Sequence, residues 1–382
     1  MTKLAQVFVD AMTGRLPRYL DDLKAMTSID CGTHNKAGID RVVQLLADRL
    51  SDAGAEVEIK ENAEAGNDVV GRLYGRGSRR VLLLCHSDTV YPDGTAASRP
   101  YRVEGDSILA PGVCDMKAGI LTALNALFLL GDAGFDDFAG ITLLCTSDEE
   151  APPRHSVELI KAAAREVDAV FCMEPARANG DMVSARKGVV VYTLVAKGRE
   201  AHAGVQPEMG RSAVVALASR VCEIWKLNGL RPGLTVNPGI FRGGTAANTV
   251  AGEATCVLDL RVARTEDIEA FESAIQETLS ASVIPDIEFD LTADVAMPPM
   301  EKTHSSQRLV DLAVQAAAEV GFPVTDTSTG GGSDGAYAAS TGTPVLDGLG
   351  PVGGQAHSER EYVVRSTIVP RTAMLARLIT FI

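Results

Sequence analysis

Short apolar runs along this chain end abruptly at charged side chains. Residues 81–90, VLLLCHSDTV, form a leucine-rich and β-branched run that stops at His86 and Asp88. Residues 141–150, ITLLCTSDEE, repeat this design and end in Asp148, Glu149 and Glu150. A buried strand that ends in this way brings polar groups, whose burial is costly, to the rim of a sheet.

Two further segments deliver a carboxylate in the same way. Residues 169–174, AVFCME, end at Glu174. Residues 110–120, APGVCDMKAGI, place Asp115 in a Gly/Pro loop before a helical run. Ligands of open α/β sheets bind outside the carboxyl ends of the strands. We therefore expect these charged ends to form one shared site.

Strand-like and helical patterns alternate through the first half of the chain. Apolar residues recur at helical spacing over residues 41–55, residues 117–134 form a mostly apolar helical run, and strand-like runs lie between them. The alternation predicts βαβ units, and hence an α/β fold with a mostly parallel sheet and helices on both faces. Residues 3–27 are expected to form one or two helices, with a break near Pro17.

The pattern changes after residue 186. Strand-like and amphipathic helical stretches follow in the order β-α-β-β-α-β up to residue 296, which is the order of a split βαβ unit. We expect residues 187–296 to form an inserted α+β domain of ferredoxin-like type. Residues 1–186 and 297–382 would form the main domain, and the Pro-rich MPPM at residues 297–300 marks the return to it.

The composition is that of an ordinary globular protein, with 46% hydrophobic and 23% charged residues. Its 382 residues predict about two domains. The formal net charge of −14 argues against a nucleic-acid partner, because phosphate contacts need a basic face. The N-terminal segment is typical of an amphipathic helix and not of a secretory signal, and no stretch approaches 18 apolar residues. A cytoplasmic protein without a membrane partner is therefore expected.

The seven cysteines include no C-x-x-C pair, so no disulfide framework is indicated. Four of them lie in or beside the apolar runs that lead to the predicted site: Cys85, Cys114, Cys145 and Cys172. The simpler interpretation is that they are small buried hydrophobic side chains. A thiolate zinc site is the alternative.

The charged ends and a later loop together supply two imidazoles and three carboxylates, from His86, Asp115, Glu150, Glu174 and His357. This set suits two divalent metals bridged by one carboxylate and one hydroxide. Each motif alone has a simpler explanation. An H-x-D pair can be structural, a DEE end can be a solvated turn, Asp115 can cap a helix, and Glu174 can lie in a surface turn. The joint pattern at strand ends favours a metal site.

Acidic residues next to the predicted ligands are expected to have other roles than metal binding. Asp88 follows His86 by two residues in an extended segment, so it can accept the second N–H of that ring and orient it. Adjacent side chains of an extended segment diverge, so only one of Glu149 and Glu150 is expected to bind metal. The other would serve as general base for a metal-activated water.

Eight motifs resemble, in order along the chain, those of one family of co-catalytic di-zinc hydrolases. They are HSDTVYPDG, GVCDMKAG, TSDEE, MEPA, GREAHAG, GGTAANTV, GGGSDGAYAA and GGQAHSEREYV. The family includes glutamate carboxypeptidase (carboxypeptidase G), acetylornithine deacetylase, succinyl-diaminopimelate desuccinylase and aminoacylase. The chain is most similar to the glutamate carboxypeptidase branch.

The resemblance implies a role for each predicted ligand. His86 and Glu174 would hold one zinc ion, Glu150 and His357 would hold the other, and Asp115 would bridge the two. Two Zn²⁺ per chain are implied, and Co²⁺ or Mn²⁺ suits the same ligands. The peptide bond after Asp115 is often cis in the family.

The resemblance also implies catalytic and substrate-binding residues. Glu149 would be the general base, and Asp88 would orient a ligand imidazole. The inserted domain would be a lid and the site of homodimer formation. In it His202, acting in the partner's site, and Asn248 would polarise the scissile carbonyl. Arg261 would bind the substrate carboxylate.

The implied activity is hydrolysis of the amide bond of a small N-acyl amino acid or dipeptide-like substrate with a free carboxylate. The alternatives are an N-deacylase or desuccinylase that recognises the acyl group, and a catalytically silent scaffold. Met182 and Met297 stand where the glutamate-selective enzyme carries a lysine and an arginine, which argues against strict glutamate selectivity. A G-x-G-x-x-G at residues 330–335 is a weak dehydrogenase signal, because the polar VTDTST before it lacks the required apolar strand.

Overall fold

The chain divides into two compact units, which a computed structural model describes over residues 2–152 and 154–382. The first unit extends from the N-terminus to Ser184 and includes Lys302–Ser328 and Ser333–Ile382. The second comprises Ala185–Glu301 and Thr329–Gly332. Each unit has its own hydrophobic core.

The main sheet of the first unit has six strands in the order β1-β2-β6-β3-β7-β16. They are β1 (Glu56–Lys60), β2 (Asp68–Tyr74), β3 (Arg80–His86), β6 (Gly140–Thr146), β7 (Ala169–Cys172) and β16 (Val345–Leu346). Strands β6, β3, β7 and β16 run parallel, and β1 and β2 add an antiparallel edge. The mostly parallel sheet predicted from the alternating pattern is confirmed.

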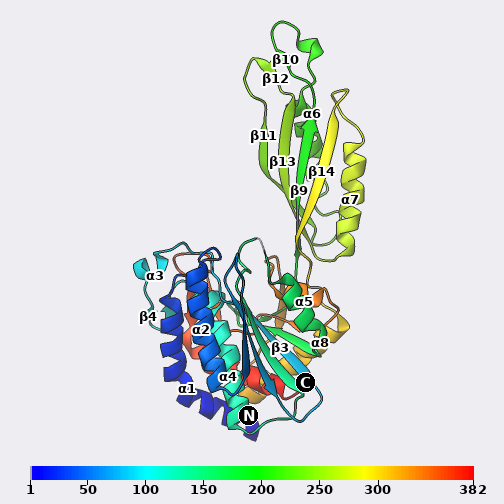
Figure 1. Cartoon of the computed structure of the whole chain (residues 1–382). Helices are drawn as coiled ribbons and strands as arrows, with labels where there is room; N and C mark the ends of the chain where they lie inside the picture. Colours follow the sequence, from blue (N-terminus) through cyan, green and yellow to red (C-terminus); the bar gives the residue numbers. More distant parts are fainter. Residues whose placement is uncertain (1, 153) are drawn as a thin grey trace. The chain divides into compact units, whose positions relative to one another are not determined.

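Helices cover both faces of this sheet (Figure 1). The helices of the first unit are α1 (Lys3–Thr27), α2 (Lys36–Asp52), α3 (Thr95–Ser98), α4 (Ala118–Asp132), α5 (Val157–Arg165), α8 (His304–Val320), α9 (Gly335–Ala339) and α10 (Ile368–Ile379). Val81, Leu83 and Cys85 of β3 share one core with buried residues of α1, α2, α4, α8 and α10. Leu82 and Leu84 alternate to the opposite face, where α5 lies, so β3 is buried on both sides.

Helix α4 lies in the centre of the first core. The run Val113–Asp132 is long and apolar enough to cross a membrane by length and composition, but 89% of its most apolar window is buried inside the protein. It packs against α1 and α10. A helix that is apolar on all sides is expected in such a central position.

The predicted break near Pro17 is wrong, because α1 continues through this residue as a single helix. Phe8 and Met12 before the proline and Tyr19 and Leu23 after it are all buried in the same core. Packing on both sides of the proline therefore outweighs the backbone hydrogen bond that it cannot donate.

Two small sheets flank the main one. Strands β4 (Arg102–Glu104), β5 (Ser107–Leu109), β17 (Gly353–Gly354) and β18 (Tyr362–Val364) form one of them, and β8 (Met182–Arg186) pairs with β15 (Asp326–Thr329). The glycine loop at residues 330–335 follows β15, which lies outside the parallel sheet, and leads into the five-residue helix α9. A dinucleotide site needs a strand of the parallel sheet before its glycines, so this loop does not form one.

The second unit has the predicted β-α-β-β-α-β order, which is confirmed. Its antiparallel sheet, in the order β11-β13-β9-β14, consists of β9 (Gly188–Lys197), β11 (Thr235–Gly243), β13 (Glu253–Val262) and β14 (Glu288–Met297). Helices α6 (Ala213–Trp225) and α7 (Glu266–Leu279) bury Leu217 and Phe271 in the core formed with this sheet. Strands β10 (Ala201–His202) and β12 (Thr249–Val250) form a separate short ladder.

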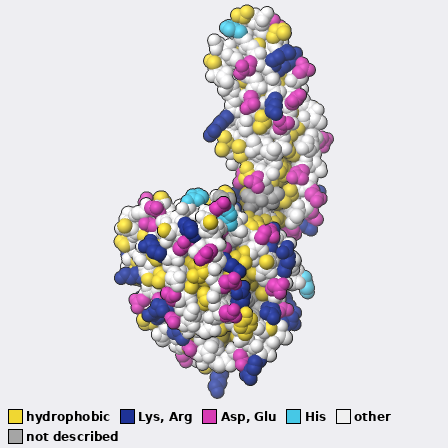
Figure 2. Space-filling view, in the orientation of Figure 1, with side chains coloured by type: hydrophobic (Ala, Val, Ile, Leu, Met, Phe, Trp, Pro, Cys, Tyr) yellow, Lys and Arg dark blue, Asp and Glu magenta, His cyan; other side chains and the backbone are white. Residues whose placement is uncertain are grey.

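Acidic and basic side chains are interspersed on the face of each unit that Figure 2 shows. All seven cysteines are free thiols, and six of them are buried. The four cysteines of the apolar runs are thus small buried side chains, as predicted.

Candidate metal centre

Three parallel strands bring charged residues to one edge of the main sheet. His86, the last residue of β3, pairs with Thr146, the last residue of β6. Leu84 of β3 pairs with Cys172, the last residue of β7. The chain reaches Glu150 shortly after β6 and Glu174 shortly after β7, so the three strand ends deliver an imidazole and two carboxylates to one place.

Two loops complete the site. Asp115 lies in the irregular turn Val113–Lys117 directly before α4, and the peptide bond that follows it is cis, as the family resemblance implies. His357 lies in the loop between β17 and β18 and has a φ of 63°, a left-handed conformation that is uncommon for residues other than glycine.

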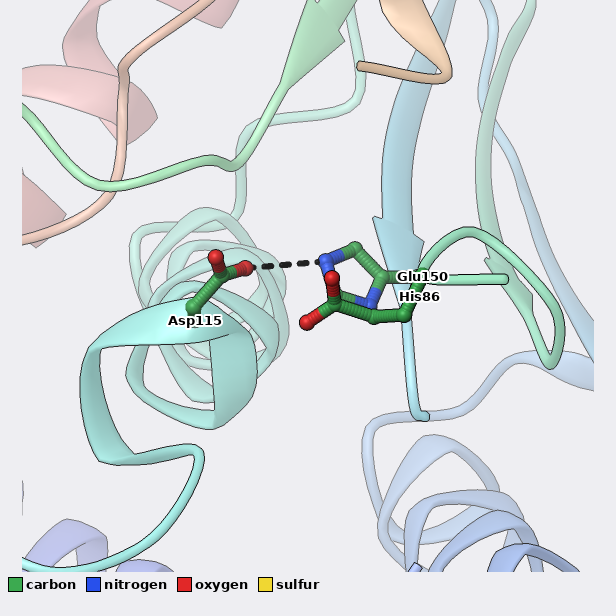
Figure 3. Close-up of side chains that lie close together, drawn as sticks. All are labelled: His86, Asp115 and Glu150. Carbon is green, nitrogen blue, oxygen red and sulfur yellow. Dashed lines mark hydrogen bonds and ion pairs between the residues drawn. The ribbon is translucent and has the colours of Figure 1, made fainter. Parts of the chain in front are cut away.

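Asp115 stands between the two imidazoles. Its Oδ1 lies 3.1 Å from Nε2 of His86, and its Oδ2 lies 3.3 Å from Nε2 of His357. Glu174 Oε1 is 3.5 Å from His86 Nε2, and Glu150 Oε2 is 3.1 Å from His357 Nε2. Figure 3 shows His86, Asp115 and Glu150 pointing toward one another from the end of β3, the turn before α4 and the loop after β6. Their ligand atoms all lie within 4.8 Å of one another.

These distances fit divalent cations. Two atoms that bind a tetrahedral ion at about 2.0–2.2 Å lie roughly 3.3–3.6 Å apart. The nitrogen–oxygen distances of 3.1, 3.3 and 3.5 Å are close to this separation. Imidazole nitrogen and carboxylate oxygen are also the donors that zinc and related ions take. The five predicted ligands, with Asp115 shared, are therefore a suitable set for two cations.

Asp88 is buried behind His86, and both of its carboxylate oxygens have partners. Oδ1 lies 3.3 Å from Nδ1 of His86 and accepts from the backbone N–H of Glu149 at 3.1 Å. Oδ2 accepts from the hydroxyl of Thr33 at 2.6 Å and the backbone N–H of Glu150 at 3.0 Å. Burial alone would raise the pKa of Asp88, but His86 and Thr33 outweigh it and lower the pKa. An ionised Asp88 thus holds the ring with Nε2 toward the ligands.

The Glu149 carboxylate differs from that of Glu150. Among the described residues it has no hydrogen-bond partner, whereas Glu150 faces His357. Burial raises the pKa of Glu149 well above its usual range, and the neighbouring acids Asp334 and Glu174 raise it further against the opposing effect of His86. A carboxylate whose pKa is raised in this way accepts a proton more readily than an exposed one.

The ligands hold their charges by mutual pairing. Burial would lower the pKa of His86, but its bonds to Asp115, Asp88 and Glu174 outweigh burial and raise it. Asp115 and Glu150 raise the pKa of His357 to about 10. In turn, His357 and His86 lower the pKa of Asp115 against the effect of burial.

Three buried groups near the site were not predicted as functional. Thr33 binds Asp88, as described above. Glu361 accepts hydrogen bonds from the loop that carries Asp115, and its only sequence signal is its place four residues after His357 in the GGQAHSEREYV motif. Thr146 donates to Asp334 Oδ2 at 2.7 Å, and burial raises the pKa of Asp334 to about 7.

The three remaining predicted residues lie in the second unit. His202 and Asn248 are exposed neighbours at the β10–β12 ladder, where the carbonyl of Asn248 accepts from the N–H of Ala203 at 2.9 Å. Arg261 of β13 forms a two-pronged ion pair with Asp259, with N–O distances of 2.7 and 3.0 Å. Its guanidinium is therefore engaged by a carboxylate two residues away on the same strand.

Comparison with known proteins agrees with this geometry. Residues 82–380 match the model of peptidase family M20/M25/M40. Carboxypeptidase G2 from Pseudomonas sp. (strain RS-16) is 34% identical over 387 residues, which cover 99% of this chain and 93% of that protein. Succinyl-diaminopimelate desuccinylase from Alkalilimnicola ehrlichii is 27% identical and covers 84% of this chain and 88% of its own length.

Solved structures share the fold. The aminopeptidase PepT of Bacillus cereus has a TM-score of 0.79 at 21% identity, over 95% of this chain and 98% of its own. The M20 metallo-carboxypeptidase Sso-CP2 of Sulfolobus solfataricus has a TM-score of 0.74 at 16% identity, over 95% and 99%. The chain belongs to peptidase family M20/M25/M40, and it is a hydrolase that acts on amide or peptide bonds.

We expect cation binding to displace protons from this site. A cation needs the unprotonated Nε2 of His357, whose pKa is raised to about 10 in the metal-free protein. Cation affinity should therefore rise about tenfold per pH unit for each proton released, up to that pKa. Calorimetric titration of the metal-free protein between pH 7 and 9, in buffers with different ionisation enthalpies, measures the released protons.

His304→Gln is the control for this titration, because His304 begins α8 and contacts none of the five ligands. It should release as many protons as the wild type. Affinity that does not change with pH in the wild type would contradict the assignment of His357 as a ligand.

Proposed function

We propose that this protein is a two-cation metallocarboxypeptidase or amidohydrolase with Zn²⁺ as its metal. Its substrate would be a small N-acyl amino acid or dipeptide-like molecule with a free carboxylate. The proposal rests above all on Asp115, whose two oxygens face two different imidazoles at distances that suit shared cations. The 34% identity to carboxypeptidase G2 over nearly the whole chain supports this substrate class.

Each residue of the site has a separate role in the proposed reaction. Two cations in this site would polarise the scissile carbonyl and lower the pKa of water. Glu149 takes the proton of the attacking water and delivers it to the leaving nitrogen. Asp88 keeps the His86 ring in one orientation throughout. His86 and Glu174 are buried, and burial strengthens such electrostatic effects.

Replacement of Glu149 tests whether this residue acts as the general base or as a metal ligand. Glu149→Ala should lower kcat by about 1,000-fold or more, which corresponds to about 4 kcal/mol in the barrier, because the carboxylate proposed to accept the proton is removed. Its metal content, measured by atomic emission, should stay near that of the wild type. Glu158→Gln on the exposed side of α5 is the control. Loss of metal with an unaffected rate in the loaded fraction would contradict the role of Glu149.

The side-chain preference of the proposed enzyme follows from two buried methionines. Met182 and Met297 offer no charge at positions where the glutamate-selective enzyme carries a lysine and an arginine. We therefore propose a single recognised carboxylate and a neutral or aromatic side chain. An N-deacylase or desuccinylase is the second candidate, favoured by the desuccinylase relatives that match 84–85% of the chain.

Arg261 is the proposed partner of the substrate carboxylate. Arg261→Ala should lower kcat/KM about 100-fold, or about 3 kcal/mol, for substrates with a free carboxylate, because a charged two-pronged contact is lost. The matching substrate amides should be affected little. Arg264→Ala, which removes a more exposed arginine close to Arg261 in the chain, is the control. Equal losses on acids and amides would indicate that Arg261 only stabilises the fold.

His202 and Asn248 are proposed to polarise the scissile carbonyl, with His202 acting in the partner's site of a homodimer. Both are exposed at the β10–β12 ladder, and the second unit also exposes Trp225 and Phe241. A homodimer formed through this unit would cover such side chains.

Subunit exchange tests this arrangement. His202→Ala and Glu149→Ala homodimers should each be inactive, whereas mixed dimers should regain up to half of the wild-type activity per dimer, because one of the two sites receives both intact residues. Mixing two Glu149→Ala preparations is the control. Mixed dimers verified by mass spectrometry that show no recovery would refute action in the partner's site.

A cytoplasmic location is proposed as well. Seven free thiols suit a reducing compartment, and none of them forms a disulfide among the described residues. Cell fractionation tests this location.

A further inference from the structure

Glu361 is a buried carboxylate that the reaction proposed above does not use. It lies directly before β18, and the residue is only 2% exposed. Oε1 accepts from the backbone N–H groups of Cys114 at 2.8 Å and Asp115 at 2.9 Å. Oε2 accepts from the N–H of Gly112 at 2.8 Å and the hydroxyl of Tyr91 at 2.7 Å. Four donors thus converge on one side chain.

These donors lie in two loops, each of which contains or follows a proposed metal ligand. Glu361 lies in a third loop. Tyr91 follows the strand that ends in His86, and the three N–H groups belong to the turn that carries Asp115. Glu361 belongs to the loop that carries His357. One carboxylate therefore ties together three chain segments that are far apart in the sequence.

The bonding pattern defines the charge of Glu361. Backbone N–H groups can only donate, so both oxygens of Glu361 must accept hydrogen bonds. An ionised carboxylate accepts on both oxygens, whereas a protonated carboxyl group uses one oxygen as a donor. Hydrogen bonds to a charged acceptor are also stronger than those between neutral groups. Burial favours the protonated form, and the four donors oppose it.

The same cluster holds the backbone beside His357. The carbonyl of Ser358 accepts from Arg99 Nη1 at 3.0 Å and lies 2.9 Å from the Tyr91 hydroxyl, whose one proton it shares with Glu361. The Arg99 guanidinium stacks on the Tyr91 ring at 4.4 Å. Gln355 and His357 both have positive φ values, which the chain does not favour by itself. Contacts from outside the loop are therefore needed to keep His357 in place.

We propose that Glu361 is a positioning residue that sets the distance between Asp115 and His357, and through it the affinity for the cation that these two residues and Glu150 hold. The proposal rests on the cation-dependent function proposed above. It does not require Glu361 to touch a cation or the substrate. Its effect passes through the backbone N–H of Asp115 and the loop that carries His357.

Glu361→Gln tests the proposal at nearly constant side-chain volume. The glutamine amide keeps one oxygen that accepts hydrogen bonds. Its NH₂ group cannot accept, so the donors that face it lose their hydrogen bonds. Stepwise titration of the metal-free, full-length protein with Co²⁺, in competition with a chelator, gives the affinity of each cation. The visible absorption of bound Co²⁺ reports its coordination. We expect one of the two affinities to fall at least tenfold in Glu361→Gln, with an altered spectrum.

Two further variants make the test specific. Tyr91→Phe removes one of the four donors and should weaken the same cation by a smaller factor, with little further loss in the double variant. Glu319→Gln is the matched control, because Glu319 also accepts side-chain hydrogen bonds, from Arg377 and Thr2, but lies on α8. It should leave both Co²⁺ affinities unchanged.

The melting temperature of the chelator-treated variants shows whether Glu361 positions the cation ligands or stabilises the whole fold. Unchanged Co²⁺ affinities in folded Glu361→Gln would overturn the proposal, as would equal drops in melting temperature with and without cation. If Glu361→Gln does not fold, unchanged affinities in Tyr91→Phe would overturn it. Wild-type protein that binds no Co²⁺ would instead refute the two-cation function on which the proposal rests.

Discussion

Mutual repulsion among carboxylates at one edge of the main sheet is the constraint on which the rest of this structure depends. Asp115, Glu150 and Glu174 converge there, with Asp88 and Glu361 buried close behind them. Unpaired buried charges of one sign are prohibitively costly, so the fold must surround them with donors or positive charge. Two imidazoles, a set of backbone N–H groups and the proposed cations meet that requirement.

The parallel strands and the loops contribute differently to this arrangement. The strands align the ends of β3, β6 and β7, and buried neighbours on both faces leave little freedom in that alignment. The loops that carry Asp115 and His357 have irregular backbone and lack such support. Buried carboxylates replace it: Asp88 binds the loop after β6, and Glu361 binds the turn before α4. Acidic residues thus serve here both as ligands and as supports for ligands.

The second unit contains the residues proposed to bind the substrate. Of its proposed functional residues, His202 and Asn248 are exposed at the β10–β12 ladder, and Arg261 is half-buried on β13. Arg261 is paired with Asp259 through its Nε and Nη2 atoms. The substrate carboxylate proposed for Arg261 would meet a guanidinium that this ion pair already orients. The metal centre would then provide reactivity, and the second unit selectivity.

The sequence by itself was enough to predict the mostly parallel sheet, the β-α-β-β-α-β order of the second unit and the five residues that converge in the metal centre. The sheet and the order of the second unit follow from local periodicity, and His86, Glu150 and Glu174 follow from their places at strand ends. Asp115 and His357 lie in loops, within the motifs GVCDMKAG and GGQAHSEREYV. The continuity of α1 through Pro17 could not be predicted, because buried residues on both sides decide it. The roles of Thr33, Tyr91 and Glu361 were equally hidden, since each acts on a segment distant in sequence. A hydrogen-bond partner brought close only by folding leaves no periodic trace, so only the tertiary structure could decide which polar residues support the site.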